Sequence, residues 1–185
     1  DITGNEIKIL YESPLIENEP RSYDMVLPGP GFYDWRSDKP STVYWVEALD
    51  GGDIKKEMEF HEQGYTLDQP FSGESVKLAA TNLRFGGITW GRDNFAIITE
   101  GSSKSRMRMV SSFNPSAPMS AKKKIHEYNN DDGYRNPGRF ITDLNPYGRN
   151  TLLFADKGKS LLLSGAGASP EGDRPFLDKY DILTG

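Results

Sequence analysis

Residues 31–48, GFYDWRSDKPSTVYWVEA, decide the fold: a glycine-led strand, an aspartate-containing turn and an apolar strand follow one another. Residues 86–100, GGITWGRDNFAIITE, repeat this order around a second tryptophan. Residues 138–155, GRFITDLNPYGRNTLLFA, form a weaker third copy that lacks tryptophan. The second strand of each copy is almost continuously apolar, which is typical of a strand buried on both faces. The repeat therefore predicts several equivalent β-units.

Strand-like runs bounded by Gly, Pro, Asn and Asp recur along the chain, and helical periodicity is nearly absent. We expect strands over residues 7–11, 42–48, 76–80, 95–99, 107–110, 151–155, 161–163 and 176–182. Long loops over 63–75 and 114–121 would explain a repeat longer than the ~40–45 residues of common propellers. The pattern predicts an all-β fold, a partial β-propeller with about three four-stranded antiparallel blades. An ordinary β-sandwich is the alternative, but it does not explain the repeated order.

The repeats divide the chain into blades at 31–82, 83–130 and 131–185, with an outer strand of a preceding blade and a linker at 1–30. Residues 1–6, DITGNE, and 180–185, YDILTG, share one hairpin-turn pattern. We therefore expect the chain to begin and stop at equivalent points of two blades, so that the last blade lacks its outer strand. Pairing of 7–11 with 176–182, within one molecule or in a strand-exchanged homodimer, would cover both edges.

Composition excludes several partners. The net charge of −5 argues against nucleic acid, and the short run Lys122-Lys123-Lys124 is better explained as a solvated strand edge. No apolar run approaches the ~20 residues of a membrane helix, so we expect no membrane partner. The chain has no cysteine, which excludes disulfides and thiolate sites. Because it opens on DITG without an initiator Met, we expect it to lie inside a longer protein.

The sequence offers no catalytic, metal or cofactor motif. Gly-x-Ser-x-Gly is absent, and residues 165–169, GAGAS, lack the lysine and the helix of a phosphate loop. Residues 129–133, NNDDG, lack the closing glutamate of a calcium loop. His61 and His126 have no partner at ligand spacing, and we expect both on the surface. We accordingly predict no catalytic residue, no metal and no cofactor.

Three stretches carry a resemblance to a known family: residues 35–53, WRSDKPSTVYWVEALDGGD; 83–90, LRFGGITW; and 165–178, GAGASPEGDRPFLD. They resemble the propeller of glutamyl endopeptidases in the prolyl oligopeptidase family of serine peptidases. The resemblance implies that an N-terminal propeller covers a C-terminal α/β-hydrolase domain and restricts the access of peptide substrates. The family's Ser, Asp and His lie in that hydrolase domain. The resemblance thus implies a proteolytic parent and a non-catalytic segment whose partners are the hydrolase domain and the peptide substrate.

Five arginines are candidates for facing the substrate, because a guanidinium can hold a glutamate carboxylate through two hydrogen bonds. These candidates are Arg36, Arg84, Arg92, Arg106 and Arg108. The alternative for each is a structural pair with Asp38, Asp93 or Glu100, or simple exposure. The loop bounded by Asp50 and Asp53 is a candidate for docking on the hydrolase domain, or else a tight turn.

Two other functions remain open from the sequence. The chain could be a stand-alone propeller module that binds a protein or glycan ligand. A Gly-x-Ser-x-Gly motif downstream in the parent gene would argue against this function and for the peptidase. It could also be a carbohydrate-active propeller, which would need a pair of carboxylates converging on one channel.

Overall fold

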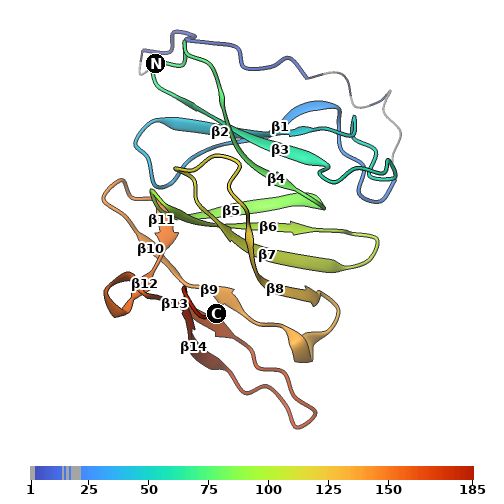
Figure 1. The fold of residues 1–185 in the computed structure, drawn as a ribbon, viewed down its shortest axis with the longest axis vertical. Coiled ribbons are helices and arrows are strands. Elements are labelled where there is room, and N and C mark those ends of the chain that lie inside the picture. Colours follow the sequence, from blue (N-terminus) through green and yellow to red (C-terminus); the bar gives the residue numbers. More distant parts are fainter. Residues whose placement is uncertain (1–2, 14, 16, 18–21) are drawn as a thin grey trace.

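The computed structural model describes residues 3–13, 15, 17 and 22–185. Its strands form antiparallel sheets stacked face to face along the long axis of the molecule (Figure 1). The first sheet contains β1 (Gly29–Trp35), β2 (Thr42–Ala48), β3 (Glu62–Asp68) and β4 (Val76–Thr81). The second contains β5 (Arg84–Arg92), β6 (Phe95–Gly101), β7 (Met107–Phe113) and β8 (Lys123–Asn129). Strand order follows sequence order in both, so the prediction of an all-β chain with four-stranded antiparallel sheets is confirmed.

The third sheet is less regular. Its long strands, β13 (Ser160–Gly165) and β14 (Phe176–Asp181), pair with each other. The short strands β9 (Arg139–Phe140) and β12 (Phe154–Ala155) share the other edge of β13. A separate hairpin of β10 (Thr142–Leu144) and β11 (Asn150–Leu152) lies between them in sequence. The 3-10 helices η2 (Gly133–Arg135) and η3 (Asp156–Gly158) complete this part. None of the sheets formed by the described residues closes on itself.

The second sheet is buried on both faces. From its central strand β6, Ala96 and Ile98 face the first sheet and pack in one core cluster with its Tyr44, Val46 and Leu78. Phe95 and Ile97 face the third sheet and its Leu161 and Leu163. Alternation along a strand sends neighbouring side chains to opposite faces, so a strand between two sheets must be apolar throughout. This geometry accounts for the run FAII at 95–98.

Three predicted elements are wrong. The single strand expected over 151–155 is divided at Leu153 between β11 and β12, which belong to different sheets. Residues 7–11 form no strand; they are exposed, and Lys8 Nζ donates to the carbonyl of Phe71 beside the first sheet at 3.0 Å. They lie at the opposite end of the stack from β14, two sheets away, so pairing within one molecule does not occur (Figure 1). Residues 63–68, expected in a loop, belong to β3, because they pair along the whole length of β2. Pairing across a dimer stays a prediction, and residues 1–2 of the N-terminal turn lie outside the described residues.

In the part of the chain that the structure describes, no helix is long and apolar enough to cross a membrane.

Candidate functional site

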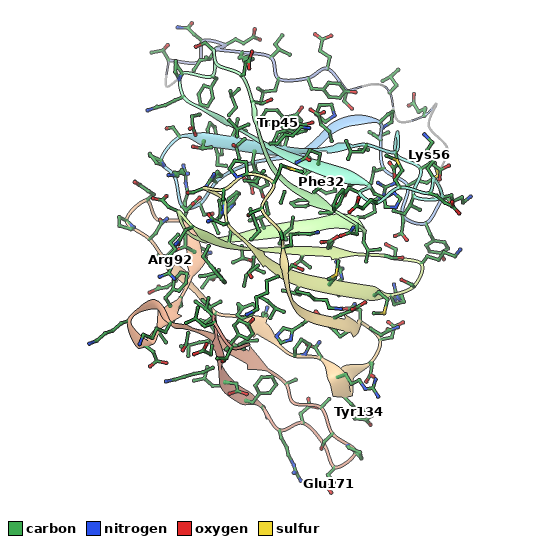
Figure 2. All side chains as sticks on the ribbon, in the orientation of Figure 1. Phe32, Trp45, Lys56, Arg92, Tyr134 and Glu171 are labelled. Carbon is green, nitrogen blue, oxygen red and sulfur yellow. The ribbon has the colours of Figure 1, made fainter. Side chains whose placement is uncertain are left out.

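The five arginines occupy two opposite ends of the strands. Arg84 begins β5, and Arg106 and Arg108 lie at the start of β7, at the end that also carries the loop after Asp50. Arg36 and Arg92 lie at the other end, where the first strand of each sheet turns into the second. Figure 2 shows this separation through Lys56, in the loop after Asp50, and Arg92, which lie on opposite sides of the molecule.

Three of the arginines line one small cavity of about 150 Å³, which we call the arginine pocket. The complete lining is Arg84, Phe85, Gly101, Ser102, Ser103, Arg106, Arg108 and Asn130. Strand register brings two of the arginines together, because Gly101 pairs with Arg84 on one side and with Arg108 on the other. Directly opposed residues project to the same face of a sheet, so the glycine leaves a gap between two long cationic side chains.

The charges of these arginines are compensated unequally. Arg84 is buried, with its guanidinium 2.8 Å from Asp50 Oδ2 and 3.5 Å from Glu62 Oε1. Arg106 is exposed and pairs with Asp131 at 3.1 Å. Among the described residues, Arg108 has neither an ion pair nor a side-chain hydrogen bond. Within the part of the chain that the structure describes, Arg108 is therefore the one guanidinium of the arginine pocket without an ion-pair partner.

Asp50 is buried, and its side chain stabilises the loop that follows β2. Its carboxylate accepts a hydrogen bond from the Gly52 N–H at 2.8 Å and lies 2.9 Å from His61 Nδ1. Burial raises the pKa of Asp50, but the hydrogen bonds from Arg84, His61 and Gly52 outweigh burial and hold that pKa below its ordinary value. Asp53, at the other end of the loop, is partly exposed and accepts from the Lys55 N–H at 3.0 Å.

His61 was expected on the surface, and this expectation is wrong: its exposed fraction is 9%. With Asp50 it resembles the orienting half of a catalytic triad. No serine or threonine hydroxyl of the described residues is hydrogen-bonded to it, so the pair lacks a nucleophile. His126 is partly buried against Phe140 and Tyr180, and burial lowers its pKa. No group of three or more His, Cys, Asp or Glu among the described residues could hold a metal ion.

Residues 22–28, which we call the strap, join the loop after Asp50 to the start of β5. Within it, the Val26 N–H donates to the Gly52 carbonyl at 3.1 Å, and Arg84 Nε donates to the Asp24 carbonyl at 2.6 Å. The carbonyl of Val26 would lie 2.0 Å from a Cβ at position 52, where φ is +90°. Only glycine fits such an approach, so Gly52 is needed for the strap to lie where it does.

The Asp24 carboxylate caps the turn between β6 and β7. It accepts hydrogen bonds from the Ser102 hydroxyl at 2.6 Å, from the Ser103 N–H, and from the Lys104 N–H at 3.3 Å. Burial raises the pKa of Asp24, but these three donors outweigh it and hold the pKa below its ordinary value of 3.8. The turn next to the arginine pocket is thus already a carboxylate-binding turn.

The hydrogen bonds to the Asp24 carboxylate predict that the attachment of the strap to the turn between β6 and β7 depends on pH. Because the pKa of Asp24 is lowered in the folded state, its ionised form stabilises the cap fully above the ordinary value of 3.8, and this stabilisation is lost as pH falls through the folded pKa. We expect the amide NMR signals of Ser103 and Lys104 to titrate below about pH 4. In Asp24→Asn the titration should be absent, while Asp178→Asn, an exposed aspartate on β14, should leave it intact. Unchanged amide shifts in the native protein would contradict the cap.

At the opposite end, Arg36 and Arg92 have partners. Arg36 is buried, forks onto Asp38 through Nε and Nη2 at 3.1 and 2.8 Å, and lies 4.3 Å from the Trp90 ring centroid. Arg92 lies over Phe154 at 4.5 Å and donates to the Gly158 carbonyl at 3.2 Å. Both cations therefore contribute to packing between sheets.

Sequence reasoning missed a sixth arginine at this end. Arg149, in the turn between β10 and β11, donates to the carbonyls of Arg36, Lys39 and Pro40 at 3.0, 2.9 and 3.4 Å. The β10–β11 hairpin is thereby attached to the turn between β1 and β2 of the first sheet. Lys39 also pairs with Asp93 of the second sheet at 2.8 Å. The turns at 36–41, 93–94 and 145–149 therefore meet at the end of the strands that carries Arg36 and Arg92.

Two buried glutamates lie at the link between the first and second sheets: Glu62 was missed by sequence reasoning, and Glu100, expected as a possible partner of an arginine, pairs with Lys122 instead. Glu62 on β3 accepts from the Phe85 N–H, and Glu100 on β6 accepts from the Asn82 and Leu83 N–H groups at 2.6 and 3.1 Å. Together they hold the link between the first and second sheets. Burial raises the pKa of Glu62, and the Phe85 N–H and Arg84 offset this only in part. A glutamate at the end of an otherwise apolar strand, as in AIITE, is the one signal that the sequence offers.

Comparison with known proteins finds relatives along the whole chain. It is 34% identical over 190 residues to the probable chloroplastic glutamyl endopeptidase of Arabidopsis thaliana, covering 98% of this chain. It is 32% identical over 189 residues to the protein of the same name in Oryza sativa subsp. japonica, covering 100% of this chain. The chain spans only 20% of the length of each of these curated relatives. No family model matches the chain. No solved structure gives a significant match.

Proposed function

We propose that this chain is a non-catalytic β-propeller segment of a serine peptidase of the prolyl oligopeptidase family that acts at glutamyl residues. Its role would be to gate substrate access to an α/β-hydrolase domain and to dock on it. Relatives named as glutamyl endopeptidases match the chain throughout, and they are about five times its length.

The observation that carries the proposal is the stacking of sheets around β6. Successive four-stranded antiparallel sheets of a propeller pack face to face, and their first strands gather toward a common axis. Burial of the second sheet on both faces supports this arrangement. So does the convergence of the turns at 36–41, 93–94 and 145–149 through Arg149 and Lys39. In the same proposal, the end with the arginine pocket and Asp53 is the end available for the substrate and the hydrolase domain.

The test has two parts. First, the purified chain should not hydrolyse Glu-containing peptides or react with a fluorophosphonate probe for active serines, whereas the intact peptidase should do both. Hydrolysis by the chain alone would overturn the non-catalytic role.

The second part tests gating in the intact peptidase. Arg149→Ala removes three hydrogen bonds between the turns and should loosen the sheets, so cleavage of a Glu site inside a folded protein should rise relative to cleavage of a short peptide with the same sequence. Arg174→Ala, which removes an exposed pair with Glu171, should leave that ratio unchanged. An unchanged ratio in Arg149→Ala, with the short peptide cleaved normally, would contradict a gate that depends on these turns.

A further inference from the structure

We propose that His126 makes the packing of the third sheet on the second sensitive to pH: the neutral ring joins the two sheets, and the protonated ring leaves the contact. His126 lies on β8, the edge strand of the second sheet, and its neighbours β9 and β14 belong to the third sheet (Figure 1). This role of His126 is independent of the proposed peptidase function.

The His126 ring lies against two aromatic rings of the third sheet. Its centroid is 6.2 Å from that of Phe140, with the ring planes 22° apart, and 6.2 Å from that of Tyr180, with the planes 65° apart. Phe140 and Tyr180 also contact each other at 5.8 Å, and both belong to the core between the second and third sheets. His126 therefore extends this core to the edge strand of the second sheet.

Protonation of His126 is unfavourable in this position. Its Nε2 atom is buried and has no hydrogen-bond partner among the described residues. An imidazolium carries a proton on both ring nitrogens, so protonation would place a charged N–H donor there without an acceptor. A cation is attracted to an aromatic face within about 6 Å, and Phe140 lies only at this limit. Burial accordingly lowers the pKa of His126.

A cavity beside the ring has room for the protonated form. Its volume is about 290 Å³, and its lining includes His126, Leu163, Phe176 and Asp178. A charged imidazolium is better solvated in this opening than between two aromatic rings, so protonation should turn it away from Phe140 and Tyr180. The second and third sheets would then lose the ring that joins them at this edge.

Asp178 is the acidic group that faces His126. The charged and titratable groups on the strands around the ring are Arg108 on β7, Lys123, Lys124, Glu127 and Tyr128 on β8, Arg139 on β9, and Asp178, Lys179, Tyr180 and Asp181 on β14. Glu127 pairs with Lys124, and Asp181 accepts from N–H groups of its own turn. Asp178 lines the cavity and shares a face of β14 with Tyr180, because alternate residues of a strand point to the same side. It is therefore the carboxylate that a charged ring in the cavity would meet.

The lowered pKa fixes the pH range of the effect. Between the folded pKa of His126 and its ordinary value of 6.5, the unfolded chain binds more protons than the folded chain. The contribution of the neutral ring to stability is therefore complete above 6.5 and is lost as pH falls from 6.5 through the folded pKa.

The first test follows the native chain by NMR from about pH 8 to about pH 4.5, a range in which Asp24 stays ionised. The Cε1–H signal of His126 should titrate below 6.5, and the ring signals of Phe140 and Tyr180 should shift with the same midpoint. If these two rings keep their signals while His126 titrates, or if His126 titrates at or above 6.5, the proposal is wrong.

Substitutions add an independent readout. His126→Phe keeps an aromatic ring that cannot be protonated, so the fall in the urea unfolding midpoint expected for the native chain between about pH 7.5 and about pH 5 should be absent. Asp178→Asn removes the facing carboxylate and should move the titration of His126 to lower pH. The control Asp173→Asn changes an exposed aspartate in the loop before β14 and should leave that titration unchanged. An acid transition that persists in His126→Phe would assign the effect to another group and overturn the proposal.

Discussion

Replacing Trp90 with alanine is expected to lower the free energy of unfolding by about 3–5 kcal/mol, the range for removing a large aromatic side chain from a packed core. Trp90 is 2% exposed and contacts Tyr44 and Phe113 edge-on at 5.2 and 6.4 Å. It also lies beneath the buried guanidinium of Arg36 at 4.3 Å. The substitution would leave a cavity between the first and second sheets. Urea unfolding followed by circular dichroism measures the effect.

Trp35 provides the matched control, because it occupies the same place in the sequence repeat but is 48% exposed. It contacts Phe71 at the edge of the first sheet at 5.9 Å. Trp35→Ala should therefore lower the free energy of unfolding clearly less than Trp90→Ala, by about 1 kcal/mol, the usual size for a single substitution. Equal losses for the two variants would mean that the first and second sheets do not pack as the structure places them.

Replacing Glu100 with alanine is expected to lower the free energy of unfolding by about 3–5 kcal/mol, because removing one partner of a buried ion pair leaves the charge of the other partner uncompensated. Glu100 is fully buried, pairs with Lys122, and accepts the N–H groups of Asn82 and Leu83. The variant would leave the Lys122 ammonium group and the N–H groups of Asn82 and Leu83 without their partner, in the link between the first and second sheets. Urea unfolding gives the loss, and hydrogen exchange at Asn82 and Leu83 should accelerate locally.

Glu127→Ala is the control for Glu100→Ala. Glu127 pairs with Lys124 on the exposed face of β8, where both side chains are about half exposed. An exposed pair of this kind contributes little, so its loss should change the unfolding free energy by no more than about 1 kcal/mol. If Glu100→Ala is equally mild, the buried glutamate does not hold the link between the sheets.

The candidate site could be predicted only in part. Three of the five arginines singled out by the sequence meet in one pocket, because strand register places Arg84 and Arg108 on either side of Gly101. Which of them is neutralised could not be predicted, since their partners Asp50, Glu62 and Asp131 lie more than 20 residues away along the chain. Arg149 gave no signal, because its partners are carbonyl groups, which every residue has.

By itself, the sequence determined that this protein is all-β, where most of its strands and turns lie, and that the second strand of each of the first two repeats is largely buried. These properties follow from local alternation and from glycine and proline at turns, which act over a few residues. Only the tertiary structure decided that Trp90 is buried and Trp35 is not, although both occupy the same place in the repeat. It also decided that residues 7–11 form no strand, because a strand needs a neighbouring edge with which to pair. Burial and pairing of this kind depend on neighbours far away in the chain, and a local pattern carries no information about them.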